Sequence, residues 1–193
     1  MLILASASPR RRDLLEQIGL TFTVETADID ETPQLAEDPI AYVRRLAEHK
    51  AAAVFARHTD RSRLIVLGAD TTVVARTSES DNTILGKPLD DEDAARILRL
   101  LSGRTHRVIT GVAIITATAP PLVAAEITEV EFSPLTDRDI AAYIATGEPL
   151  GKAGAYGIQG RAAKFIPRIH GDYFNVMGLP LARVTAMLAQ LNR

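Results

Sequence analysis

The stretch RLIVLGADTTVV, from Arg63 to Val74, is the most strand-like part of this sequence. Residues 64–67 form an unbroken apolar run, which is typical of a buried strand. Gly68–Asp70 interrupts that run, and we therefore expect a buried strand, a tight feature at GAD and a second strand. Strand and helix signals alternate on both sides of this stretch, which favours an α/β fold.

Helix start and stop signals define the elements around it. A strand over Leu2–Ala5 leads to a helix from Pro9 to Ile18, and Asp38 with Pro39 opens a helix that ends near Arg57. Two long β runs, which are joined by TATAPP, predict an antiparallel component and hence a mixed sheet. The other elements up to the second β run are a strand near Phe22–Glu25, a turn or hairpin tip in RTSESDNT, a helix over Asp91–Leu101, and strands near His106–Thr116 and Leu122–Phe132. The elements after it are a helix over Thr136–Ala145, a strand region opened by GKAGAYGIQGRAAKF, and a last helix from Gly178 or Leu179 with Pro180 in its first turn.

The composition is that of one globular domain, which we expect to span residues 1–193. Of the 193 residues, 47% are hydrophobic and 24% charged, with a net charge of -2 and no cysteine. This charge argues against bulk binding to nucleic acid or to an anionic membrane, and the absence of cysteine excludes disulfide and thiolate chemistry. We read no signal peptide and no membrane span, and we expect a cytoplasmic protein.

The stretch LASASPRRRDLL places Arg10, Arg11 and Arg12 in the first turn of a helix. That end of a helix carries partial positive charge and normally favours anions. A single arginine there would be a solvated side chain. Three of them directly after a strand favour a bound anion such as phosphate, with hydroxyl contacts from Ser6 and Ser8.

Carboxylates and lysines in four other segments suit the same chemistry. Asp70 at the exit of the apolar strand fits either a turn residue or a metal ligand or base. Glu31 lies in an acidic loop, where it is solvated or, with substrate phosphates, a ligand of Mg²⁺. Lys50 is either an exposed lysine of a helix or a cation that neutralises a triphosphate. Lys87 is either a residue of a turn or a second such cation.

The glycine-rich segment KAGAYGIQG predicts a turn-rich hairpin or a loop close to a ligand. It is not a Walker loop, because its lysine precedes the glycines and GK[ST] is absent. The amide of Gln159 donates and accepts hydrogen bonds, and it can therefore read the edge of a base.

Six segments in this order resemble the Maf family of nucleoside triphosphate pyrophosphatases, and the resemblance covers nearly the whole chain. They are LASASPRRRDLL, GADT, GKPLD, LSGRTHRVITGV, GKAGAYGIQG and GDYFNVMGLPL. The resemblance implies hydrolysis between the α and β phosphates, with a divalent cation, Mg²⁺ or Mn²⁺. It also implies a mixed, strongly curved sheet with flanking helices and two lobes around a deep cleft, similar to the inosine triphosphatases, and a homodimer.

The resemblance also implies residue roles. The proton acceptor of the family falls on Asp70, and its catalytic and phosphate-binding residues fall on Ser8, Arg11, Glu31, Lys50 and Lys87. We expect Asp70 and Glu31 to hold the metal.

Three positions match the dTTP/UTP branch of the family rather than the branch that acts on 7-methyl-GTP. They are Arg10, Thr71 and Gln159, where the second branch tends to have Trp, Gln and Glu. A neutral Gln suits a uracil edge, whereas a Trp would stack on a cationic methylated purine. Three alternatives stay open: a pyrophosphatase for inosine, xanthosine or 7-methyl-GTP nucleotides, a nucleotide-binding regulator of cell division without turnover, and an RNA-binding module, for which 5% aromatic residues offer little stacking.

Overall fold

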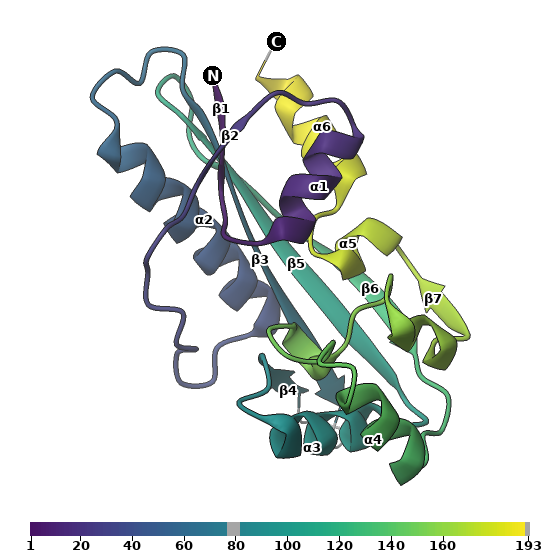
Figure 1. Ribbon diagram of the computed structural model, residues 1–193. Coiled ribbons are helices and arrows are strands. Elements are labelled where there is room, and N and C mark those ends of the chain that lie inside the picture. The colour runs from purple at the N-terminus through teal and green to yellow at the C-terminus, as the bar shows by residue number, and fades with distance from the viewer. Residues whose placement is uncertain (77–81, 192–193) are drawn as a thin grey trace. The chain divides into compact units, whose positions relative to one another are not determined.

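The computed structural model describes residues 1–76 and 82–191 (Figure 1). Its strands are β1 (Leu2–Ala5), β2 (Thr23–Glu25), β3 (Ile65–Arg76), β4 (Asn82–Leu85), β5 (Thr105–Thr116), β6 (Leu122–Glu131) and β7 (Arg168–His170). Its α-helices are α1 (Pro9–Gln17), α2 (Pro39–Arg57), α3 (Asp91–Leu101), α4 (Asp137–Ile144), α5 (Tyr173–Met177) and α6 (Leu181–Gln190). Two 3₁₀ helices, η1 (Ala153–Ala155) and η2 (Arg161–Phe165), precede β7.

The described strands form one seven-stranded sheet in the order β2-β1-β3-β5-β6-β7, with β4 paired to β3. Strand β1 pairs in parallel with β2 and β3, whereas β3–β4 and β6–β7 are antiparallel. The prediction of a mixed α/β sheet with flanking helices is confirmed. The strong curvature and the deep cleft stay predictions. The predicted hairpin tip in RTSESDNT falls mainly on residues 77–81, which lie outside the described residues.

The chain divides into two compact units. The first comprises Met1–Thr71, Thr110–Glu126 and Gly178–Arg193, and the second comprises Thr72–Ile109 and Ile127–Met177. The boundaries fall inside β3, β5 and β6, so each of these long strands contributes residues to both units. The expectation of a single domain over residues 1–193 stays a prediction.

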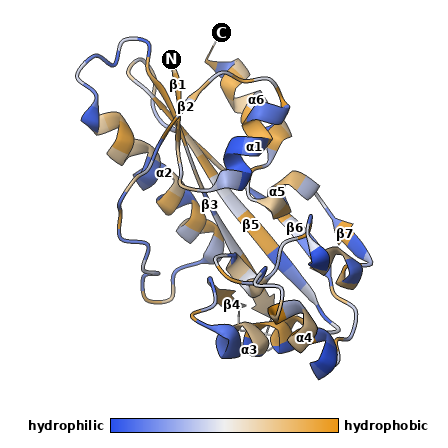
Figure 2. Ribbon diagram, viewed as in Figure 1, coloured by the Kyte–Doolittle hydropathy of each residue, from blue (hydrophilic) through white to orange (hydrophobic). Residues whose placement is uncertain are grey.

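In the first unit, α2 covers one side of the strands, and α1 and α6 lie on the other side (Figure 1). Asp38 caps α2 by accepting hydrogen bonds from the amides of Ile40 and Ala41. The inner side of α2 contains alanines that pack against apolar residues of β1, β3 and β5, while other positions of the helix are hydrophilic (Figure 2). The packed residues are Ala47, Ala51 and Val54 of α2 with Ile3, Ala5, Val66, Ala113 and Ile115.

Two glycines of the sheet allow α2 to approach closely. A Cβ on Gly68 would collide with the carbonyl oxygen of Ala47, and a Cβ on Gly111 would collide with that of Val43. The tight feature predicted at Gly68–Asp70 is wrong, because β3 runs unbroken from Ile65 to Arg76. Gly68 makes room for the helix backbone instead of turning the chain.

The second unit has its own core, built from α3, α4, the 3₁₀ segment and the strands around them. Phe132, His106 and Tyr156 form edge-to-face ring contacts with centroids 4.9–5.4 Å apart. The segment GKAGAYGIQGRAAKF forms η1 and η2, where Gly154 has a φ of 70°, which suits glycine. The strand region expected to open there is the short strand β7, which follows η2.

The C-terminal region differs slightly from expectation. The short helix α5 was not predicted, and α6 begins at Leu181 with Pro180 just before it, rather than at Gly178 or Leu179. No helix within residues 1–76 and 82–191 has the length and apolar character that crossing a bilayer requires.

Candidate functional site

Lys50 of α2 lies between two carboxylates of the first unit. Its Nζ is 2.7 Å from Oδ1 of Asp70 in β3 and 2.7 Å from Oε1 of Glu31. The side chains of Lys50 and Asp70 are only 10% and 11% exposed, whereas that of Glu31 is 50% exposed. The cluster is thus open to solvent on the side of Glu31. The sequence predicted all three residues as site residues, and the structure brings them together.

The packing of α2 explains how residues twenty positions apart meet. Gly68 seats the helix backbone against β3 at Ala47. Lys50 lies three residues after Ala47, on the same face of the helix, and Asp70 lies two residues after Gly68, on the same face of the strand. The close approach therefore holds the part of α2 that contains Lys50 near the strand that contains Asp70.

The loop that contains Glu31 is held by two residues of α2. The Tyr42 hydroxyl donates to the carbonyl oxygen of Glu31 at 2.9 Å. Arg45 makes a bidentate ion pair with Glu37 at 2.7 Å and donates to the carbonyl oxygen of Thr32. Burial, with the charges of Asp70 and Glu31, raises the pKa of Tyr42 to about 12, so its hydroxyl stays a donor at neutral pH. Sequence reasoning missed Tyr42 and Arg45, whose only signal was their position on a helix next to an acidic loop.

Arg11 lies buried and donates four hydrogen bonds to protein acceptors. Its Nε donates to the carbonyl oxygen of Gly178 at 2.8 Å, and Nη1 donates to Ser6 Oγ at 3.1 Å and to the carbonyl oxygen of Ala69 at 2.8 Å. Its Nη2 donates to Thr71 Oγ1 at 3.0 Å. Burial lowers the pKa of Arg11, while the charges of Asp70 and Glu31 act in the opposite direction. The cation at the start of α1 is tolerated because its guanidinium donates hydrogen bonds to backbone carbonyl oxygens.

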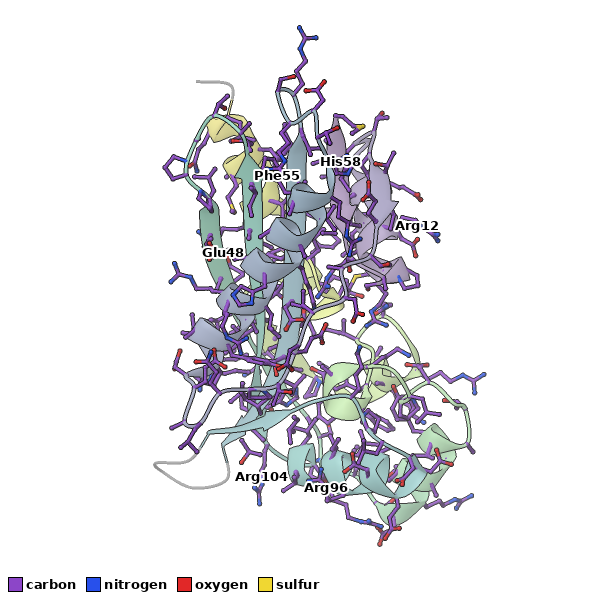
Figure 3. All side chains as sticks on the ribbon, turned by 90° about the vertical axis from the view of Figure 1, so that its left-hand side faces the viewer. Arg12, Glu48, Phe55, His58, Arg96 and Arg104 are labelled. Atoms are coloured by element: carbon purple, nitrogen blue, oxygen red, sulfur yellow. The ribbon has the colours of Figure 1, made fainter. Side chains whose placement is uncertain are left out.

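The other arginines of the triplet differ. Arg12 is exposed and pairs with Asp13 at 3.2 Å, and its side chain points away from the protein in Figure 3. Arg10 is half-buried, and burial lowers its pKa. Ser8 precedes α1, but within the described residues its hydroxyl does not cap the helix; its amide donates to Ser6 Oγ at 3.2 Å.

Thr71 joins the Arg11 network to β5. Its Oγ1 lies 2.9 Å from Thr110 Oγ1 and 3.4 Å from the carbonyl oxygen of Gly178. Thr110 and Gly178 were not predicted as site residues, because nothing in the sequence reveals which strand or turn adjoins Thr71. The structure thus gathers Ser6, Arg11, Asp70 and Thr71 at one strand region of the first unit.

Lys87 and Gln159 belong to the second unit. Lys87 is exposed in the segment between β4 and α3. Gln159 is exposed between η1 and η2, while Ile158 beside it is buried. Their predicted roles at the same site stay predictions.

The carboxylate pair has the chemistry of a magnesium site. Two carboxylate oxygens that lie 2.7 Å from one ammonium nitrogen are close enough to share a cation, and Mg²⁺ is usually held by one or two carboxylates plus substrate phosphates. No group of three or more His, Cys, Asp or Glu side chains that could hold a metal occurs in the described part of the chain. An all-protein cage is therefore absent from that part, and the residues fit an ion completed by substrate.

The sequence of the chain matches the family described as "Maf-like protein" over residues 1–191. The chain belongs to the Maf family. A relative from Pelotomaculum thermopropionicum, named "dTTP/UTP pyrophosphatase", is 52% identical over 188 residues, which cover 97% of this chain and 94% of that protein. A relative of the same name from Moorella thermoacetica is 53% identical and covers 97% and 93%. The resemblance inferred from the six ordered segments is confirmed.

Two solved structures match this Maf protein at low sequence identity. The "Nucleoside-triphosphatase / dITP/XTP pyrophosphatase" from Mycobacterium abscessus has 15% identity and a TM-score of 0.41, over 69% of this chain and 74% of that one. The Ham1 protein of Staphylococcus aureus has 14% identity and a TM-score of 0.44, over 68% and 71%.

Proposed function

We propose that this protein hydrolyses dTTP and UTP to the nucleoside monophosphate and pyrophosphate. The observation that carries the proposal is the Asp70–Lys50–Glu31 cluster, in which a buried carboxylate is held against a buried cation beside a half-exposed carboxylate. Relatives named dTTP/UTP pyrophosphatase are 52% and 53% identical to this chain, and this similarity supports the same activity.

In this mechanism Asp70 is the proton acceptor. Its carboxylate takes a proton from a water molecule as the water oxygen forms a bond to phosphorus. The bridging phosphorus–oxygen bond breaks, and its electron pair leaves with the departing phosphate group. Lys50, fixed 2.7 Å from Asp70, both orients the carboxylate and stabilises negative charge nearby.

Asp70 and Glu31 would hold the divalent ion, Mg²⁺ or Mn²⁺. When bound, such an ion supplies Lewis-acid polarisation of phosphoryl oxygens. Lys50 would supply positive charge to the phosphates beside the two carboxylates.

The remaining phosphate contacts are assigned to Ser8, Arg10 and Lys87. Arg11 uses four of its five N–H groups on protein acceptors, so we assign it mainly to the placement of Ser6 and Thr71. Direct contact of Arg11 with phosphate stays a prediction.

Substrate choice rests on Arg10, Thr71 and Gln159. The Gln159 amide offers one donor and one acceptor to the N3–H and carbonyl groups of a uracil or thymine base. Catalysis in the cytoplasm and assembly as a homodimer stay predictions.

The test is pyrophosphate release from a nucleotide panel with Mg²⁺, with Mn²⁺ and with EDTA. Metal-dependent release from dTTP and UTP, with ITP, XTP and 7-methyl-GTP slow, is the expected result. Preference for a purine nucleotide would replace the substrate assignment. Tight binding of UTP without turnover by folded protein would favour the nucleotide-binding regulator.

A further inference from the structure

The loop around Gln159 is fastened at both ends to one pair of side chains in the second unit. The amide of Gly157 donates to the Tyr143 hydroxyl at 3.2 Å, and the amide of Arg161 donates to Glu148 Oε2 at 2.9 Å. The Tyr143 hydroxyl in turn donates to Glu148 Oε1 at 2.9 Å. The two anchor points lie symmetrically about Gln159, two residues before it and two residues after it.

Two glycines of this loop allow its backbone to pack closely against Glu148 and Lys152. A Cβ on Gly160 would collide with the Glu148 carboxylate, and one on Gly157 would lie 3.1 Å from Lys152 Cε. Lys152 itself donates to the backbone carbonyl of Glu148. The spacing of Gly157 and Gly160 therefore reflects close contact with Glu148 and Lys152, not a flexible hinge.

The Tyr143 side chain lies in the core of the second unit. Tyr143 is 1% exposed, and its ring packs edge-to-face on Phe165 with centroids 5.7 Å apart. Burial and the hydrogen bond with Glu148 raise the pKa of Tyr143, so the hydroxyl keeps its proton and serves as donor and acceptor together. The Glu148 carboxylate accepts at both of its oxygens, at Oε1 from Tyr143 and at Oε2 from the amide of Arg161.

Gln159 is the exposed residue at the centre of this anchored loop. Residues 154–158 are buried, and Gln159 is the first exposed residue after them. A side chain that reads hydrogen-bonding edges must be held in place to discriminate, because a mobile amide satisfies either pattern.

We infer that Tyr143 and Glu148 are positioning residues for Gln159 and thereby set the choice between uracil and cytosine bases. This inference rests on the proposed function, in which Gln159 contacts the base. The two residues touch no substrate in this account; they act through the backbone at Gly157 and Arg161.

Tyr143→Phe tests the inference, since it removes the shared hydroxyl and leaves the ring packed on Phe165. Glu148→Gln is the second variant; its amide provides one acceptor oxygen where two are used. Tyr156→Phe is the matched control, because it deletes a buried hydroxyl 2.8 Å from His106 Nε2 without touching either anchor. Circular dichroism establishes that each variant is folded.

Two measurements are compared across the variants: the ratio of kcat/KM for UTP over CTP, and amide hydrogen exchange of the peptide that spans residues 157–161. We expect Tyr143→Phe or Glu148→Gln to lower the ratio about tenfold through KM, with faster exchange in that peptide and kcat for UTP little changed. Tyr156→Phe keeps the wild-type ratio.

An unchanged ratio in a folded, active Tyr143→Phe and Glu148→Gln overturns the inference and leaves the proposed function standing. An equal fall of the UTP/CTP ratio in Tyr156→Phe also overturns the inference, because the effect then comes from a general loss of packing in the second unit. Absence of turnover in the wild type fails the proposed function, and the positioning role fails with it.

Discussion

Lys50 and Asp70 form an ion pair of 2.7 Å, and each side chain is about nine-tenths buried. Burial of an ion pair is costly, and removal of one partner leaves a charge without compensation. The pair therefore matters for folding as well as for chemistry. Variants of Asp70 and of Lys50 should differ in stability, because Lys50 has a second partner in Glu31, which remains when Asp70 is replaced.

Asp70→Asn should remove activity and keep the fold. The amide has nearly the same shape, and Lys50 retains its contact with Glu31, so we expect a melting temperature near that of the wild type. Loss of the proton acceptor should lower kcat by about 10² to 10⁴. Pyrophosphate release and thermal denaturation check this, with Asp60→Asn, at an exposed turn, as the control. Wild-type kcat in folded Asp70→Asn would remove Asp70 from the mechanism.

Lys50→Met should destabilise the protein by about 3–5 kcal/mol, because Asp70 then stays buried without its cation. Glu31→Gln should cost less than about 1 kcal/mol, because Glu31 is half-exposed and water replaces the contact. Urea unfolding of both variants measures the difference. Lys164→Met is the control for loss of an exposed lysine. Equal costs for Lys50→Met and Glu31→Gln would contradict the role of burial.

Gly68→Ala should separate α2 from β3. The added methyl group meets the backbone carbonyl of Ala47, and we expect at least ~2 kcal/mol of destabilisation together with loss of activity as Lys50 moves. Gly86→Ala is the matched control, because a Cβ on Gly86 meets no atom within 4 Å. If Gly68→Ala keeps both stability and kcat, the close approach does not place Lys50.

Arg11→Lys should cost more stability than Arg12→Lys. A lysine at position 11 cannot reproduce four hydrogen bonds to separate acceptors, and we expect a loss of about 2–4 kcal/mol. Arg12 is exposed, and its replacement should cost less than about 0.5 kcal/mol. Chemical denaturation ranks the two. A larger effect on KM than on stability for Arg11→Lys would instead favour direct contact with phosphate.

His106 should make the protein less stable in mild acid. Burial lowers the pKa of His106 to about 3, whereas an unfolded histidine has a pKa near 6.5. Between these values the unfolded state binds the extra proton, so stability falls as pH falls through that window, by about 1.4 kcal/mol per pH unit at most.

His106→Gln should reduce the slope of melting temperature against pH between about pH 6.5 and 4. His170→Gln, at an exposed position, should leave the slope unchanged. The same slope in His106→Gln and wild type would show that other groups cause the acid sensitivity.

Local chemistry was enough to predict several elements closely. The range of α2 agrees with expectation because Asp38 and Pro39 act within its first turn, and α3 agrees because Asp90 caps it by accepting from the amide of Asp93. The interruption expected at Gly68 was wrong for a physical reason. A glycine in a strand signals either a bend or a close neighbour, and the sequence does not contain the position of α2.

The 3₁₀ segments around Gln159 show the same limit. Glycine spacing indicated unusual backbone, but it did not reveal that the amides of Gly157 and Arg161 donate to Tyr143 and Glu148. The roles of Tyr143 and Glu148 have no sequence signal of their own. They depend on which side chains the fold places under the loop.

By itself, the sequence determined the family, the residue types of the site and the helices whose caps are local, since these depend on short-range order along the chain. Only the tertiary structure decided that Lys50 meets both Asp70 and Glu31, and that Arg11 binds backbone carbonyls. Those contacts join residues 19 to 167 positions apart. Long-range packing, above all the approach of α2 to Gly68, brings them together.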